Sequence, residues 1–266
     1  MEGYQGIRAK LYDALASLRQ PDDIEFYREE ALRTGDSVLE LGCGTGRVLI
    51  PLAESRLQVV GLEPYSPMLE IAKQNISRLK NEDQERIQVI EGDMRDFSLG
   101  RQFSTILIPY RAFHHVLTPE DQRKTLLCIH KHLDDNGILI IHNGDPKLDA
   151  LVSASTGNTG ISKLSEFIHP ETGNRVILWG NRKCNLETQI SEWHYTYEEL
   201  DEYGVTISRI HNTDTTRHVF KNEMQYLLEL CGYNIKALYG NFHRGSYRYG
   251  SEQVWLVQKN KKKIDK

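Results

Sequence analysis

A glycine-rich stretch preceded by an acid is the part of the sequence best suited to bind a ligand. Residues 38–47 read VLELGCGTGR, where an apolar run turns into a stretch of glycines. Glycines at a turn from a strand into a helix let the backbone approach a ligand without interference from Cβ. The acid just before them can bind a cationic amino group. The turn supplies six candidate binding residues: Glu40, Gly42, Cys43, Gly44, Gly46 and Arg47.

The spacing of these glycines separates the turn from two better-known glycine loops. The pattern is GxGxG rather than the GxGxxG of a dinucleotide site, and no Gly-Lys-Ser/Thr follows it as in a P-loop. Tight strand–helix packing alone could also require such glycines. The acids that follow favour a binding site over that explanation.

Two further acids are expected at the ends of the next strands. Glu63 follows the first glycine by roughly twenty residues, the distance at which an acid binds ribose hydroxyls in dinucleotide folds. Asp93 could accept a hydrogen bond from an adenine amino group, with Met94 packing on the ring. Both acids would lie at the carboxyl edge of the sheet, where open α/β folds bind ligands. A solvated strand end for Glu63 and a turn-capping role for Asp93 remain alternatives.

The elements that must position these residues alternate between strand and helix up to residue 145, which predicts a mainly parallel sheet with helices on both faces. Strands are expected over residues 37–41, 57–62, 86–90, 103–108 and 138–141. Ser66 is expected to cap one helix, with Pro67 at its first position, and Thr118 another. Asn136-Gly137 is expected to close the second of these helices.

After residue 146 the alternation of strand and helix signals ends. Residues 151–160 are small and polar and predict a mobile loop, and residues 175–184, 189–197 and 205–217 predict three antiparallel strands. A helix over residues 222–230 and strands over 233–239 and 253–258 complete the expected fold. We expect residues 1–266 to form one domain, in which residues 151–220 are an inserted antiparallel β lid covering the substrate.

Together these motifs resemble class I S-adenosylmethionine-dependent methyltransferases. The matching segments are residues 38–47, 60–69, 91–96 and 133–141, in the order found in that family. The resemblance implies a Rossmann-like seven-stranded sheet and S-adenosylmethionine as cofactor. It places the glycine turn beside the methionine part, the second acid on the ribose and the third element on the adenine. It also implicates Pro64, Met68, Met94, Pro109 and, on an N-terminal helical stretch, Tyr12.

The narrower resemblance is to small-molecule enzymes, above all amino-sugar N-methyltransferases. It rests on residues 109–115 (PYRAFHH) and on the strand-rich insertion. Two features depart from patterns found in the wider family. Ile108-Pro109-Tyr110-Arg111 stands where nucleic-acid amino methyltransferases have Asp/Asn-Pro-Pro-Tyr, and Ser104 stands where an Asp is frequent.

Methyl transfer from a sulfonium is an in-line displacement that needs mainly alignment and the exclusion of water. An amine acceptor can enter neutral, whereas a hydroxyl benefits from a nearby base. The segment after the fourth strand supplies the catalytic candidates His115, His114 and Tyr110, although one histidine of such a pair is often structural. We see no metal-ligand pattern.

Two other classes of function stay open. One is a non-catalytic partner subunit that binds S-adenosylmethionine or a nucleotide. The other is a different enzyme on the same fold, such as an aminopropyltransferase or an NAD-dependent oxidoreductase, the latter disfavoured by the GxGxG spacing.

Composition sets the remaining expectations. The chain has 266 residues with 33 Lys and Arg against 37 Asp and Glu, which argues mildly against a nucleic-acid binder. Its 4 cysteines form no CxxC pair, its start lacks the pattern of a secretory signal, and no apolar run reaches the length of a membrane span. We therefore expect a cytoplasmic protein with a small-molecule acceptor, no nucleic-acid or membrane partner, and leave a homodimer open.

Overall fold

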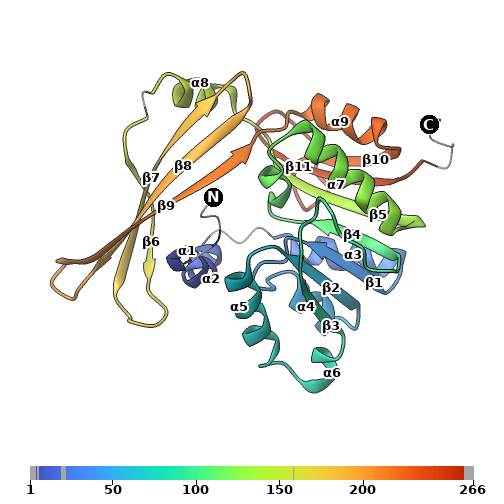
Figure 1. The fold of residues 1–266 in the computed structure, drawn as a ribbon, viewed down its shortest axis with the longest axis horizontal. Helices are drawn as coiled ribbons and strands as arrows, with labels where there is room; N and C mark the ends of the chain where they lie inside the picture. Colours follow the sequence, from blue (N-terminus) through green and yellow to red (C-terminus); the bar gives the residue numbers. More distant parts are fainter. Residues whose placement is uncertain (1–3, 5, 19–21, 158, 261–266) are drawn as a thin grey trace. The chain divides into compact units, whose positions relative to one another are not determined.

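The computed structural model describes residue 4 and residues 6–18, 22–157 and 159–260. Residues 1–3, part of the start in which no secretory pattern was found, lie outside the described residues. The chain divides into two compact units (Figure 1). The larger comprises Pro21–Pro146 and Val219–Lys266, and the smaller comprises Met1–Gln20 and Lys147–His218, in each case as far as the residues are described.

A seven-stranded sheet forms the centre of the larger unit, in the order β10-β11-β5-β4-β1-β2-β3. The five strands from β1 to β5 are parallel to one another, and β11 is antiparallel to both β5 and β10. This confirms the expected mainly parallel, seven-stranded sheet. The strands are β1 Ser37–Leu41, β2 Gln58–Glu63, β3 Ile87–Glu91, β4 Phe103–Ile108, β5 Leu133–Gly144, β10 Tyr233–Tyr239 and β11 Glu252–Lys259.

Helices cover both faces of this sheet because its strands are apolar on both sides. Phe26 and Leu49, from helices on one face, pack with Val38 and Val59 of the strands. On the other face Leu126 and Met224 do the same with Leu39 and other strand residues. The helices are α3 Ile24–Thr34, α4 Leu49–Glu54, α5 Ser66–Ile76, α6 Asn81–Gln84, η1 Ala112–His115, α7 Pro119–His132 and α9 Lys221–Leu230. In the described part of the chain, no helix is both long and apolar enough to cross a membrane.

One of the two expected helix caps is confirmed. The Thr118 side chain accepts a hydrogen bond from the Asp121 N–H at 3.1 Å, as an N-cap does. The Ser66 cap is wrong: Ser66 is inside α5 and Tyr65 precedes the helix. The Ser66 hydroxyl instead donates to Glu91 Oε1 at 3.0 Å, so its partner comes from the end of β3.

The Asn136-Gly137 pair does not close α7, contrary to expectation. The helix ends at His132 and the chain passes directly into β5, where the register with β4 shifts between Phe103 and Thr105. A Cβ on Gly137 would lie 2.9 Å from the Ser104 carbonyl oxygen. The glycine therefore allows close contact with β4 instead of ending a helix.

The smaller unit contains a four-stranded antiparallel sheet in the order β6-β7-β8-β9. Its last three strands confirm the expected ones, whereas β6 was not expected. The loop expected over residues 151–160 is partly wrong, because helix α8 extends to Ser155 with Leu151 and Ala154 buried on one face. The elements are α1 Gly6–Lys10, α2 Tyr12–Ser17, α8 Leu148–Ser155, β6 Ser162–Ile168, β7 Arg175–Asn185, β8 Ile190–Leu200 and β9 Thr206–Arg217.

The N-terminal helices are anchored to this smaller sheet. Leu11 is buried against Phe167 and Leu178 of the strands. Arg8 forms a buried ion pair with Asp214 at 2.7 Å. Helices α1 and α2 thus belong to the same unit as the strands β6–β9.

Candidate active site

The glycine turn after β1 adopts a backbone that side chains disfavour. Gly42 and Gly44 have φ angles of +77° and +57°, in the left-handed region that glycine enters without steric cost. The N–H groups of Gly42 and Cys43 both donate to the Leu62 carbonyl, at 2.8 and 3.1 Å. The turn is therefore fixed to the end of β2.

Gly42 is the point where three loops meet. A Cβ at this position would lie 2.9 Å from the Cβ of Ala112 and 3.7 Å from Cε of Met94. These neighbours belong to the loops after β4 and β3. At Gly44 the corresponding Cβ would lie 3.4 Å from Cε of the buried Met68. The structure thus brings the glycine turn together with Met68, Met94 and the segment of the predicted catalytic residues.

Glu63 joins the end of β2 to the glycine turn. Its Oε2 accepts from the Gly44 N–H at 2.9 Å and its Oε1 from the Tyr65 N–H at 3.1 Å. Burial raises the pKa of the Glu63 carboxyl, although these two N–H groups act in the opposite direction. Pro64, the next residue, is exposed. The glycine turn and the end of β2 are therefore joined by a hydrogen bond through Glu63.

Glu40 has a buried oxygen that is available to a donor. The side chain lies on β1 and accepts from the Leu49 N–H, while Oε2 has no hydrogen-bond partner among the described residues. Burial raises the pKa of Glu40 well above its ordinary value, and the nearby Arg47 acts against this. An unpartnered buried acceptor costs about 1–3 kcal/mol. A cationic donor such as an ammonium group would remove that cost, which fits the expected ligand.

Arg47 pairs with an acid from the segment before α3, and its contact with the cofactor stays a prediction. Its guanidinium donates to both oxygens of Asp23, at 2.7 Å each, and lies 5.1 Å from the centre of the Tyr110 ring. Asp23 is fully buried. Sequence reasoning missed Asp23, since nothing in its spacing from Arg47 indicates a pair. Arg47 thus ties the glycine turn to the segment before α3.

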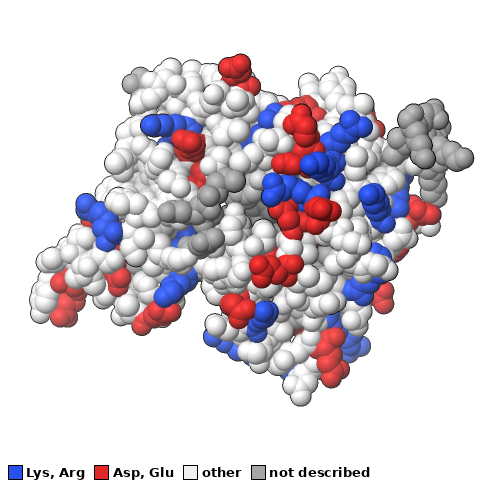
Figure 2. Space-filling model, viewed as in Figure 1, with Lys and Arg blue, Asp and Glu red and all other residues white. Residues whose placement is uncertain are grey.

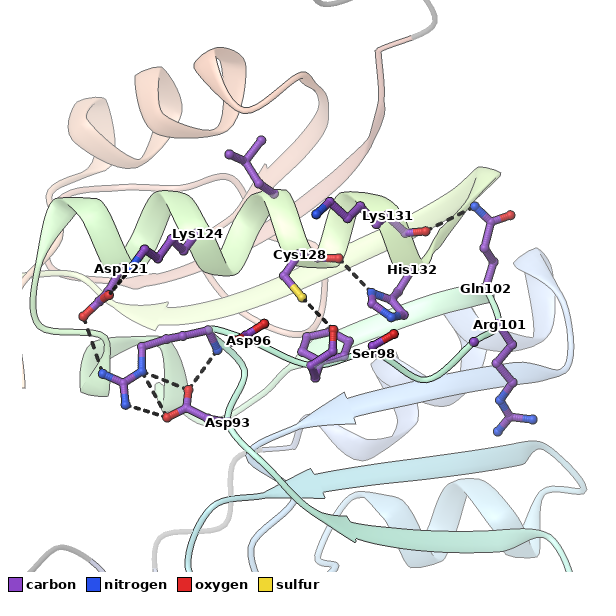
Figure 3. A pocket seen from close by; sticks show the side chains of 14 residues that line it. Asp93, Asp96, Ser98, Arg101, Gln102, Asp121, Lys124, Cys128, Lys131 and His132 are labelled. Atoms are coloured by element: carbon purple, nitrogen blue, oxygen red, sulfur yellow. Dashed lines mark hydrogen bonds and ion pairs between the residues drawn. The ribbon is translucent and has the colours of Figure 1, made fainter.

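Asp93 follows β3 and is bound by a neighbour. The Arg95 N–H and guanidinium donate to its carboxylate at 2.5–3.0 Å, and the guanidinium also lies 3.5 Å from Asp121 (Figure 3). Burial would raise the pKa of Asp93, but the hydrogen bonds from Arg95 lower it overall. These residues line a surface pocket of about 1030 Å³ between residues 93–102 and α7. Of the predicted site residues, Asp93 alone lines this pocket.

The predicted catalytic residues share one short loop after β4. Pro109 is buried, and Tyr110 follows it with a φ of +48°. The loop then forms η1, in which His114 is 7 % exposed and His115 is half-buried. His115 is therefore the more accessible of the two histidines.

Sequence reasoning missed one charged residue, Glu252, that contacts the loop after β4. Glu252, at the start of β11, bonds Arg111 at 2.7 Å through one oxygen and His142 at 2.9 Å through the other. Its partners come from β5 and from the loop after β4. Within the described ranges, no three His, Cys, Asp or Glu side chains gather so as to hold a metal ion.

Tyr12 lies in the smaller unit, where its ring is 5.6 Å from that of Tyr4. Its contact with the cofactor stays a prediction.

Comparison with known proteins finds a methyltransferase domain and methyltransferases as relatives. A family model described as "Methyltransferase domain" matches residues 38–137. A dTDP-3-amino-3,6-dideoxy-alpha-D-glucopyranose N,N-dimethyltransferase from Streptomyces fradiae is 29 % identical over 188 residues, 65 % of this chain and 69 % of that protein. The putative methyltransferase YqeM of Bacillus subtilis is 30 % identical over 138 residues, 52 % of this chain and 53 % of that protein.

Solved structures share the fold. The CcbJ methyltransferase from Streptomyces caelestis gives a TM-score of 0.76 at 19 % identity, covering 95 % of this chain and 96 % of its own. An amino pentose methyltransferase from Micromonospora echinaspora, solved with S-adenosylmethionine bound, gives 0.69 at 18 %, covering 96 % and 99 %. Together these findings show a methyltransferase domain over residues 38–137 and, for the chain, the fold of solved methyltransferases.

Proposed function

We propose that this enzyme methylates the amine nitrogen of a small hydroxylated acceptor, of the amino-sugar class. The methyl donor is S-adenosylmethionine. The choice of nitrogen is supported by the named activity of the Streptomyces fradiae relative, an amino-sugar N,N-dimethyltransferase. The choice of a small molecule over a nucleic acid is supported by the loop over residues 109–115, which has no Asp-Pro-Pro-Tyr motif.

The observation that carries the cofactor assignment is the connection between Glu63, the glycine turn and the unpartnered oxygen of Glu40. Glu40 Oε2 would accept from the α-ammonium group of the methionine part. The Glu63 carboxylate, already held by two backbone N–H groups, would accept from the ribose hydroxyls with its remaining lone pairs. Asp93 and Met94 would contact the adenine, and the exposed Pro64 and buried Pro109 would border the site.

When bound, S-adenosylmethionine would supply a methyl group activated by a positively charged sulfur, and this sulfur would leave as the acceptor nitrogen bonds to the methyl carbon in line. The protein's own residues then have to orient the amine and keep water away. Tyr110 and His115 would line the approach to the methyl group. His115 would take the proton released by the newly methylated amine, because imidazole titrates near neutral pH. His114, which is buried, would support the loop.

The smaller unit would bind the acceptor. Residues 151–220 and the N-terminal stretch with Tyr12 would cover it during transfer. We further propose a cytoplasmic enzyme acting on a free small molecule rather than nucleic acid. Acidic and basic side chains are interspersed on the face shown in Figure 2, without a basic stripe there.

The test combines binding with turnover. Calorimetric titration with S-adenosylhomocysteine measures cofactor binding, with decarboxylated S-adenosylmethionine and NAD as comparisons. Mass spectrometry then follows methylation of a panel of amino sugars and of matched sugars with a hydroxyl in place of the amine. We expect mono- and dimethylated amines. Binding without any methylated amine across the panel contradicts the assignment of acceptor class, and no binding at millimolar S-adenosylhomocysteine contradicts the cofactor site.

A further inference from the structure

We propose that Glu252 is a positioning residue for methyl transfer: by binding Arg111 it holds the left-handed Tyr110-Arg111 turn in the conformation that presents Tyr110 and His115 at the active edge of the sheet. This inference rests on the proposed function. Glu252 itself is not required to touch the acceptor or the cofactor.

The turn after β4 has an unfavourable backbone. Tyr110 and Arg111 are consecutive, both carry side chains, and their φ angles are +48° and +66°. Such residues avoid the left-handed region because Cβ approaches the carbonyl oxygen too closely. A conformation of this kind persists only where its surroundings hold it, and it is commonly found at functional sites. The contacts that hold this turn are therefore informative.

Backbone contacts secure one side of the turn. The Arg111 N–H donates to the His142 carbonyl at 3.0 Å, and the Ala112 N–H donates to the Pro109 carbonyl at 3.1 Å. The first bond fixes the turn to β5. Neither bond fixes the long side chain of Arg111.

Glu252 secures that side chain. Its Oε1 accepts from Arg111 Nη2 at 2.7 Å, and its Oε2 lies 2.9 Å from His142 Nε2. His142 is 1 % exposed and its ring is 4.8 Å from that of Phe242, so it cannot swing away. Burial would raise the pKa of Glu252, but the hydrogen bond with His142 and the charge of Arg111 lower it overall. The carboxylate is thus ionised near neutral pH and held from both sides.

Gly144 leaves the space through which Arg111 reaches Glu252. Gly144 and Glu252 are direct partners in the β5–β11 register. A Cβ on Gly144 would lie 2.5 Å from Arg111 Nε and 3.2 Å from Cδ. Gly144 is absent from the glycines with positive φ, so its backbone conformation does not require a glycine. The structure therefore explains this glycine by the Arg111 side chain, which occupies the place of a Cβ.

The other side of the turn contacts the cofactor-binding motif. The Tyr110 ring lies 5.1 Å from the guanidinium of Arg47, and a Cβ on Gly42 would lie 2.9 Å from Ala112. A shift of Arg111 would therefore move Tyr110 and the start of η1 relative to the glycine turn. Misplacement of reacting groups by about 1 Å can lower a rate by about a hundredfold.

The experiment compares Glu252→Gln with Gly144→Ala, whose Cβ would meet the Arg111 side chain. We expect each change to lower kcat by about ten- to hundredfold. The KM for S-adenosylmethionine and the Kd for S-adenosylhomocysteine should stay within about threefold, because Glu40 and Glu63 are untouched. Glu252→Asp, which keeps the charge, should recover part of kcat. The double variant should be no slower than the worse single variant, since both act through Arg111.

A matched control lies on the same strand. Lys259 forms an ion pair with Asp135 at 3.3 Å at the other end of β11, so Lys259→Met should leave kcat unchanged. Wild-type kcat in Glu252→Gln overturns the proposal, as does full additivity of the two changes. If Glu252→Gln fails to fold, Gly144→Ala and Arg111→Lys carry the same kcat comparison. Wild-type protein that neither binds S-adenosylhomocysteine nor methylates any amine would instead refute the proposed function.

Discussion

Replacing Glu63 with glutamine tests whether the end of β2 binds the ribose. Each carboxylate oxygen accepts one backbone N–H, from Gly44 at 2.9 Å and Tyr65 at 3.1 Å. Glutamine retains one oxygen, so one N–H loses its partner, at about 1–3 kcal/mol of unfolding free energy. Removing the buried charge offsets part of this loss, since burial raises the pKa of Glu63.

The effect of Glu63→Gln on cofactor binding can be measured separately from its effect on stability. A ribose hydroxyl would lose a charged acceptor, a bond worth about 1.5–3 kcal/mol. This corresponds to an increase of about 10- to 150-fold in Kd. Calorimetric titration with S-adenosylhomocysteine measures it, and thermal unfolding of the free protein measures stability, at about 2–4 °C per kcal/mol for a chain of similar size.

The neighbouring strand supplies the control. Glu91 is the direct partner of Glu63 in the β2–β3 register, is exposed, and bonds the Ser66 hydroxyl. Glu91→Gln should change Kd by no more than about twofold, as expected for a surface substitution. If Glu63→Gln melts earlier yet binds S-adenosylhomocysteine with wild-type Kd, Glu63 only holds the glycine turn and the ribose assignment fails.

Gly44→Val should abolish S-adenosylhomocysteine binding but leave the circular dichroism spectrum near wild type, because φ is +57° and Cβ would occupy the turn; measurable binding would argue against a cofactor at this turn. Asp23→Asn should lower the free energy of unfolding in urea by about 3–5 kcal/mol, because it leaves the charge of Arg47 unpaired; a loss below about 1 kcal/mol would mean that solvent replaces the pair. Burial and the charge of Arg182 lower the pKa of His218 from 6.5 to about 4. As the pH falls from 6.5 to 4, the unfolded chain therefore protonates this histidine before the folded protein does. The free energy of unfolding should fall over this pH range by up to about 3 kcal/mol. His218→Gln should remove that part of the pH dependence of thermal unfolding, and identical profiles for the two proteins would show that His218 does not contribute.

Local signals account for what could be predicted about the fold. The parallel strands are short apolar runs bounded by turns, and Thr118 caps α7 through a bond to a residue three positions away. The Ser66 cap failed because its hydroxyl found a partner 25 residues on, which no local rule includes. Strand β6 was missed because its apolar residues Leu164, Phe167 and Ile168 do not alternate with polar ones as in a half-buried strand. Helix α8 was missed because Ser153 and Ser155 give its second half a polar composition, although Leu151 and Ala154 form a buried helical face.

In the site, too, residues in local motifs could be predicted and their distant partners could not. Glycines and strand-end acids could be predicted, since a strand's end fixes where the next residues lie. The partners that orient them could not. Glu252 is 141 residues from Arg111, and their contact depends on the register of β11 against β5. Asp23 and Arg47 are likewise joined only by the packing of the segment before α3 near the glycine turn.

The pairing of the N-terminal helices with the smaller sheet has a consequence for the order of folding during synthesis. Arg8 and Asp214 are separated by 206 residues, which take about 10–40 s to add at about 5–20 residues per second. Helices α1 and α2 have 5 and 6 residues, too few to be stable alone in water. Until β9 emerges from the ribosome, Leu11 has no complete sheet to bury it. Helices α1 and α2 are thus made well before the sheet that buries them is complete, and they stay open to chaperones and proteases throughout that delay.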